Sequence, residues 1–209
     1  MRKFTILILL CNIFLIISPK VSAQNADIEI LRNINGITGT IETSKFISNS
    51  TTLVGASVPV VLGIAAIIEK DEDLLKSALS VGVSLGVSAA LTYSIKQAVG
   101  RPRPMITYPL IINSYEEIHS NSFPSGHTSF AFATATSLSL QYPKWYVIVP
   151  GYLWAGSVGY SRMNLGVHYP SDVLAGALLG AGSAWISYKI NNWLYEKPKK
   201  LFKLNEYFL

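Results

Sequence analysis

The sequence predicts an all-α protein, a membrane-embedded bundle of five transmembrane helices. Half of its 209 residues are hydrophobic and only 14% are charged, whereas about 25% of a typical soluble domain is charged. Uncharged segments also follow one another at close intervals, and as helices each would extend about 24–29 Å, close to the hydrocarbon thickness of a bilayer. These segments are residues 51–68, 77–95, 128–143, 145–160 and 173–188.

The alternative fold is a soluble all-helical domain with buried helices. Segment 128–143 supports it, because this stretch is rich in Ser and Thr and would be a poor membrane span by itself. Small residues, however, let helices approach closely in lipid, and the pairs Gly82/Gly86 and Gly176/Gly180 have the required four-residue spacing. We therefore favour the membrane bundle.

The N-terminus has the layout of a secretory signal peptide. Arg2 and Lys3 precede an apolar run at residues 4–17, and small residues end at Ala23. We predict a signal peptide over residues 1–23 with cleavage after Ala23, whereas retention would add a sixth membrane helix. Cys11 is the only cysteine, so the cleaved chain would have no disulfide, thiolate metal site or cysteine nucleophile.

Three further regions follow the leader. Residues 24–50 are polar with apolar side chains at helical intervals, which indicates an amphipathic helix at the membrane surface or against the bundle, or else a polar linker. Residues 51–190 would form the bundle, with the active site drawn from residues 96–172, and residues 191–209 would form a basic tail. The net charge of +5 is partly due to the leader, and no basic stripe indicates nucleic-acid binding.

The distribution of charge also predicts an orientation. If the mature N-terminus is outside, the alternation of five helices places the Lys-rich tail in the cytoplasm, which satisfies the positive-inside rule. Three polar motifs then fall together on the outer face.

The first motif contains Lys96 and, seven residues later, Arg103 within a Gly-Arg-Pro-Arg-Pro sequence. The prolines prevent helix continuation and stiffen the loop. Two rigidly held cations suit a phosphate, and Arg can bind two of its oxygens. The alternative is a basic cluster that touches lipid headgroups. Arg101 lies outside the motif, where it would contact a headgroup or be solvated.

The second motif is Pro124-Ser125-Gly126-His127, which precedes an apolar segment. Ser125 is a candidate N-cap, Gly126 permits close backbone approach, and the exposed N–H groups would form an anion site. His127 would lie beside that anion, although a lone histidine at a helix start is also compatible with a structural role.

The third motif contains Arg162, His168 and Asp172. Asp172 can accept a hydrogen bond from one imidazole nitrogen and leave the other free as a nucleophile. The alternative is a His–Asp pair that stabilises a loop. The loop at 105–122 contains Glu116, Glu117 and His119, which either select the substrate or belong to an ordinary solvated loop.

At these residues the sequence resembles the type 2 phosphatidic acid phosphatase family, which is related to bacterial acid phosphatases and vanadium haloperoxidases. The family pattern has three parts: Lys, six residues, Arg-Pro; then Pro-Ser-Gly-His; then Ser-Arg, five residues, His, three residues, Asp. The sequence matches it without departure at Lys96…Arg103-Pro104, Pro124-Ser125-Gly126-His127 and Ser161-Arg162…His168…Asp172.

The resemblance implies a metal-independent, cofactor-free phosphatase that acts on a lipid phosphomonoester or diphosphate at the periplasmic face of a bacterial inner membrane. It implies that His168 attacks phosphorus, that Asp172 orients it, and that His127 protonates the leaving oxygen and then activates water. The implied phosphate-binding groups are Lys96, Arg103, Arg162 and the backbone near Ser125 and Gly126.

Three other functions remain open on the sequence. They are a soluble periplasmic acid phosphatase, a vanadate-dependent haloperoxidase, and a non-catalytic lipid-binding or scaffold protein. The sequence does not choose among undecaprenyl diphosphate, lipid A, phosphatidylglycerol phosphate and phosphatidic acid as substrates.

Overall fold

The computed structural model describes residues 20–206, with side chains described for residues 26–193. Most of the predicted signal peptide lies outside the described residues. Within them the chain forms helices and no strands, which confirms the all-α prediction. The helices are α2 (Lys20–Ile34), α3 (Ile41–Glu69), α4 (Glu72–Val99), α5 (Pro104–Thr107), α6 (Gly126–Gln141), α7 (Trp145–Asn164) and α8 (Pro170–Glu206).

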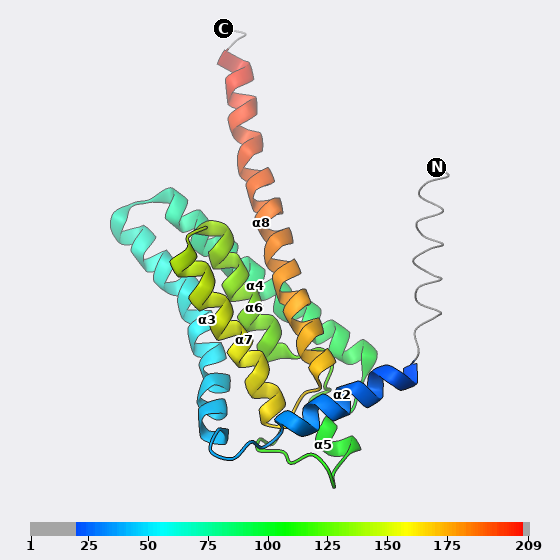
Figure 1. Cartoon of the computed structure of the whole chain (residues 1–209). Coiled ribbons are helices and arrows are strands. Elements are labelled where there is room, and N and C mark those ends of the chain that lie inside the picture. The colour runs from blue at the N-terminus through cyan, green and yellow to red at the C-terminus, as the bar shows by residue number, and fades with distance from the viewer. Residues whose placement is uncertain (1–19, 207–209) are drawn as a thin grey trace, which may run out of the picture.

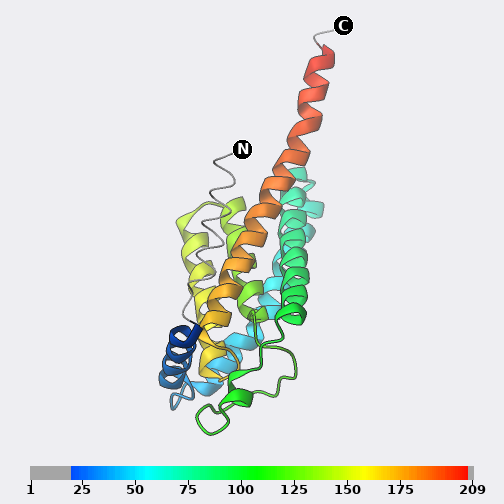
Figure 2. The same ribbon diagram turned by 90° about the vertical axis from the view of Figure 1, so that its right-hand side faces the viewer.

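The long helices α3, α4, α6, α7 and α8 stand side by side and alternate in direction, and α2 lies across one end of the bundle (Figures 1 and 2). Each predicted segment forms one of these helices, and α8 continues through part of the predicted tail to Glu206. Among the described residues, three stretches are long and apolar enough to cross a membrane: Ile41–Glu69, Glu72–Thr107 and Pro170–Trp193. The assignment of segments 128–143 and 145–160 as membrane spans stays a prediction.

Helix α6 is at the centre of the bundle, because it packs against α3, α4, α7 and α8. Its Ser and Thr side chains therefore face neighbouring helices. Ser129 Oγ, for example, lies 2.7 Å from Ser88 Oγ and accepts a hydrogen bond from Thr92 at 3.0 Å. This helps to explain how a Ser/Thr-rich helix occupies an apolar bundle, because a polar group such as Ser129 Oγ is satisfied between helices. Ser137 Oγ and Ser139 Oγ of the same helix are buried without a hydrogen-bond partner in the described protein.

Glycines on α8 allow it to approach α6 closely. A Cβ atom added at Gly176 would lie 2.6 Å from the carbonyl oxygen of Ser125, and one at Gly180 would lie 2.1 Å from that of Ser129. The prediction that this pair supports packing is confirmed. The same prediction is wrong for Gly82/Gly86, because a Cβ at Gly86 would meet nothing within 4 Å and one at Gly82 only an ordinary contact at 3.8 Å.

Large apolar side chains cover the outside of the long helices. Leu53 is 74% exposed, Ile67 is 73% exposed and Leu178 is 67% exposed, while Ser48, Ser84 and Ser183 are buried. Soluble monomers rarely expose contiguous apolar surface on this scale. The distribution is that of a helical membrane protein and disfavours the soluble alternative.

Residues 24–50 contain most of helix α2 and the first turns of α3. Leu31 is fully buried in a cluster with Ile112 and Tyr169, and the side-chain amide of Asn164 donates to the carbonyl oxygen of Ile34 at 2.9 Å. These contacts pack α2 against the bundle, and a short turn joins it to the first turns of α3.

Candidate active site

The three motifs come together at the end of the bundle that α2 crosses (Figure 1). The alternation of the helices brings about this convergence, because α4 and α7 end there and α6 and α8 begin there. The side chains that meet are Lys96 from the last turn of α4, Arg103 before α5, His127 in the first turn of α6, Arg162 from the last turn of α7, His168 before α8 and Asp172 in the first turn of α8.

His168 lies between a carboxylate and a guanidinium. Its Nδ1 is 3.4 Å from Asp172 Oδ2, and its Nε2 is 3.3 Å from Arg103 Nη1. A guanidinium can only donate hydrogen bonds, so Nε2 must be unprotonated and Nδ1 must carry the proton that faces Asp172. This is the tautomer that a nucleophilic Nε2 requires, and His168 is 2% exposed.

Asp172 is held by four groups besides His168. Its Oδ2 accepts from Ser122 Oγ and from the backbone N–H of Tyr169 at 2.9 Å, and its Oδ1 accepts from Arg101 Nη1 at 2.7 Å. Its backbone carbonyl accepts from the N–H of Ser125 at 3.0 Å. The carboxylate is fully buried and its orientation is fixed.

Arg103 forms hydrogen bonds with the backbone of the loops that precede α6 and α8. Its Nε donates to the carbonyl oxygen of Ser120 at 2.7 Å, and its Nη1 donates to that of Val167 at 2.7 Å. Lys96 Nζ donates to the carbonyl oxygen of Asn121 at 2.6 Å. The loop that precedes α6 is therefore held to the two cations of the first motif.

Arg162 has two nitrogen atoms, Nε and Nη2, that donate no hydrogen bond within the described protein. It is 1% exposed, and its Nη1 donates to Glu116 Oε2 at 2.8 Å and to Ser48 Oγ. Its Nε and Nη2 are buried and have no hydrogen-bond partner within the described protein. Buried guanidinium donors without acceptors are costly, so their arrangement indicates a site for an oxyanion that accepts from both.

The start of α6 differs in one detail from the sequence prediction. Ser125 occupies the N-cap position, but its side chain makes no capping hydrogen bond, and its Oγ accepts instead from Thr128 at 2.9 Å. Its N–H is committed to Asp172 and is not available to an anion. The N–H groups of Gly126, His127 and Thr128, which have no acceptor within the helix, are the available donors.

Both histidines are neutral at neutral pH. Burial, together with the nearby cations Arg162, Arg103 and Lys96, lowers the pKa of His127 to about 4. Burial also lowers the pKa of His168 to about 3, against the opposing effect of its hydrogen bond to Asp172. A neutral His168 is able to attack as a nucleophile without first losing a proton.

Cations dominate this site. Within the part of the chain that the structure describes, no three His, Cys, Asp or Glu side chains gather in a way that could hold a metal ion. Three cationic side chains, the helix start and the His–Asp pair together have the means to bind a tetrahedral oxyanion and to attack its central atom.

Several contributors to the site were missed by sequence reasoning. Ser122 donates to Asp172, and Glu116 accepts a hydrogen bond from Arg162. The sequence offered Glu116 only as a substrate-selecting residue or as part of a solvated loop. Arg101, which the sequence placed against a headgroup or in solvent, pairs with Asp172 and with Asp27 of α2. The acidic residue Glu117 and the remaining histidine, His119, are exposed.

The fold is a bundle of antiparallel helices, and its site places a cationic oxyanion site beside a histidine–carboxylate pair. These features are those of a phosphatase. Residues 77–196 match the PAP2 superfamily, and the chain belongs to this family.

Solved structures of similar proteins agree with this membership. The crystal structure of LpxE from Aquifex aeolicus is 31% identical with a TM-score of 0.64, and the match covers 78% of this chain and 95% of that one. The structure of a transmembrane PAP2-type phosphatidylglycerolphosphate phosphatase from Bacillus subtilis is 25% identical with a TM-score of 0.68, and the match covers 88% of this chain and 95% of that one.

A lipid A 1-phosphatase from Porphyromonas gingivalis is 32% identical over 126 residues. That match covers 59% of this chain and only 26% of the relative, so the chain spans about a quarter of that relative's length.

Proposed function

We propose that the protein is a metal-independent phosphatase that removes phosphate from a lipid phosphomonoester or diphosphate through a phosphohistidine intermediate. One observation carries the proposal: the unprotonated Nε2 of His168 faces Arg103, and the nearby Arg162 has two buried donors without acceptors. Phosphate is the tetrahedral oxyanion that such a group of donors would hold in line with a nitrogen nucleophile.

The reaction has two steps. As the anionic substrate binds, His127 takes up a proton. In the first step, Nε2 of His168 attacks phosphorus, the bond from phosphorus to the lipid oxygen breaks, and the protonated His127 gives that oxygen its proton. In the second, His127 takes a proton from water, the water oxygen attacks phosphorus, and the P–N bond breaks to release phosphate and free His168. Lys96, Arg103 and Arg162 stabilise the charge on the equatorial oxygens in both transition states.

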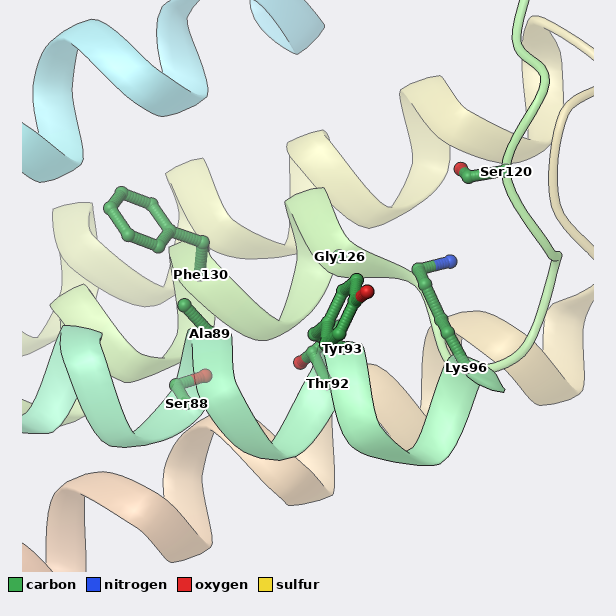
Figure 3. A pocket seen from close by; sticks show the side chains of 8 residues that line it. All are labelled: Ser88, Ala89, Thr92, Tyr93, Lys96, Ser120, Gly126 and Phe130. Atoms are coloured by element: carbon green, nitrogen blue, oxygen red, sulfur yellow. The ribbon is translucent and has the colours of Figure 1, made fainter. Parts of the chain in front are cut away.

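A cavity beside the site supports a lipid as the substrate. It has a volume of about 340 Å³ and runs between α4 and α6, with Lys96 and Ser120 at one end and Phe130 at the other (Figure 3). Its other lining residues are Ser88, Ala89, Thr92, Tyr93 and Gly126. Because Tyr93 and Ala89 are exposed on the apolar outer face of α4, a lipid chain in this cavity would enter from the bilayer while its phosphate reached Lys96.

We further propose that the protein lies in the inner membrane of a bacterium with the site on the periplasmic face. Segments 128–143 and 145–160 would complete five membrane spans, because their helices α6 and α7 pack in the same bundle as the three longer spans. A signal peptide at residues 1–23 and the Lys-rich tail on the cytoplasmic side are consistent with this orientation. The lipid itself stays open, since the relatives carry the names of phosphatases for lipid A and for phosphatidylglycerolphosphate.

The experiment is phosphate release by detergent-purified protein from four lipids: undecaprenyl diphosphate, lipid A, phosphatidylglycerol phosphate and phosphatidic acid. We expect turnover of at least one lipid in EDTA, inhibition by vanadate, and no turnover by His168→Ala, which retains the circular dichroism of the wild type. Full activity of His168→Ala, or a strict requirement for Mg²⁺, would refute the mechanism. Faster hydrolysis of a soluble aryl phosphate than of every lipid would refute the lipid specificity.

A further inference from the structure

Arg101 joins helix α2 to the catalytic carboxylate. Its Nη1 donates to Asp172 Oδ1 at 2.7 Å, and its Nη2 donates to Asp27 Oδ2 at 2.9 Å. The guanidinium also lies over the ring of Tyr169, with 3.9 Å from Cζ to the ring centroid. A planar cation that is paired at both ends and stacked on one face has little freedom to move.

Asp27 is the anchor of this arrangement. It is 8% exposed, although it belongs to an amphipathic helix at the end of the bundle. Its Oδ1 accepts from the backbone N–H of Ser171 at 2.9 Å, and its Oδ2 accepts from Ser171 Oγ as well as from Arg101. The carboxylate thus binds both Arg101 and the first turn of α8, one residue before Asp172.

The two oxygens of Asp172 have separate partners as a result. Oδ1 is occupied by Arg101, and Oδ2 faces Nδ1 of His168 together with Ser122 and the Tyr169 N–H. If Arg101 were released, the carboxylate could rotate and the direction of the imidazole would no longer be set. A displacement of about 1 Å at a reacting atom can cost about 10²-fold in rate.

We propose that Asp27 and Arg101 are positioning residues of the reaction: Asp27 fixes Arg101, Arg101 fixes Asp172, and Asp172 directs Nε2 of His168 at phosphorus. Helix α2 thereby becomes part of the active site without touching the substrate. The proposal rests on the proposed phosphatase function. Neither residue is among those that hold the phosphate oxygens, so their loss should affect kcat and leave KM nearly unchanged.

The test compares Asp27→Asn with Glu29→Gln in the full-length protein. Asn keeps the size of Asp27 and an acceptor for Ser171, but it loses the charge that fixes Arg101. Glu29 lies on the same helix and is exposed, so Glu29→Gln makes the matched change of charge away from the site. Turnover of the best lipid from the panel is measured per competent site, with sites counted by titration with vanadate, and thermal unfolding is recorded in parallel.

We expect Asp27→Asn to lower kcat per site about 10- to 100-fold with KM within about threefold, while Glu29→Gln matches the wild type. Arg101→Lys should lower kcat similarly, because an ammonium cannot pair with both carboxylates in the geometry of the guanidinium fork. The double variant Asp27→Asn/Arg101→Lys should be no slower than the slower single variant, since both residues act through one chain of contacts.

Three outcomes would overturn the proposal: an unchanged kcat per site in Asp27→Asn, a loss wholly explained by fewer vanadate-binding sites, or additive effects in the double variant. The second outcome would leave Asp27 with only a structural role in holding α2. Failure of the phosphatase function is distinguishable, because the wild type and Glu29→Gln would then release no phosphate.

Discussion

Replacement of Arg162 by Lys tests the oxyanion site most directly. The substitution keeps the positive charge but removes the planar fork that presents Nε and Nη2, the two buried donors without acceptors. We expect Arg162→Lys to lose most of its kcat, because hydrogen bonds to the equatorial oxygens strengthen as charge develops in the transition state.

The magnitude follows from the number of lost donors. A hydrogen bond to a charged group contributes about 1.5–3 kcal/mol, so the loss of two amounts to about 3–6 kcal/mol. Each 1.36 kcal/mol is a factor of ten, which predicts a fall in kcat/KM of about 10²–10⁴-fold. The ammonium of Lys keeps charge and donors near the phosphate, so the lower part of that range is expected.

The assay is phosphate release from the best lipid substrate in mixed micelles, with kcat and KM separated. Arg32→Lys is the matched control, because Arg32 is exposed on α2, and it should stay within twofold of the wild type. An Arg162→Lys variant that folds with wild-type thermal stability and retains more than a third of wild-type kcat/KM would refute the assignment of Arg162 to the oxyanion.

Two further predictions concern packing and proton uptake. Gly180→Ala should destabilise the bundle by about 1–3 kcal/mol, because the added methyl would overlap the Ser129 carbonyl oxygen at 2.1 Å. The control Gly182→Ala should leave the stability unchanged, because a Cβ atom there would meet nothing within 4 Å. Equal thermal unfolding temperatures for the two variants would contradict the described packing. Phosphate binding near pH 6 should add a proton to His127, because the anion offsets the cations that help to lower its pKa to about 4. Calorimetry in buffers of different ionisation enthalpy should show more proton uptake by the wild type than by His127→Gln, and equal uptake by both would refute it.

The helices were predictable because their causes are local. Composition and spacing predicted one helix at each of five segments, and the structure has them there. The boundaries differed where local signals compete with packing: α3 begins at Ile41 within a polar stretch, because Ser44 and Ser48 face the bundle and are buried. The Gly82/Gly86 pair shows the limit of a short motif, since the same spacing also arises where no neighbour approaches closely enough to exclude a Cβ atom.

Much of the site was predictable from the three motifs. Lys96, Arg103, Arg162, His168 and Asp172 all lie at one end of the bundle, because each motif is tied to a helix end whose position follows from the alternation of the helices. Their chemical roles stay predictions until the variants are assayed. The exception in geometry is Ser125, whose N–H binds Asp172 rather than an anion.

The sequence by itself determined which motif residues come together and the end of the bundle at which they meet, because these depend on spacing along single helices and on the alternation of their directions. Only the tertiary structure decided which residues hold them in place. Asp27 meets Arg101 across 74 positions of sequence, and Glu116 meets Arg162 across 46. Such pairs are set by the packing of α2 and of the loop before α6 against the bundle, and no local pattern in the chain records them.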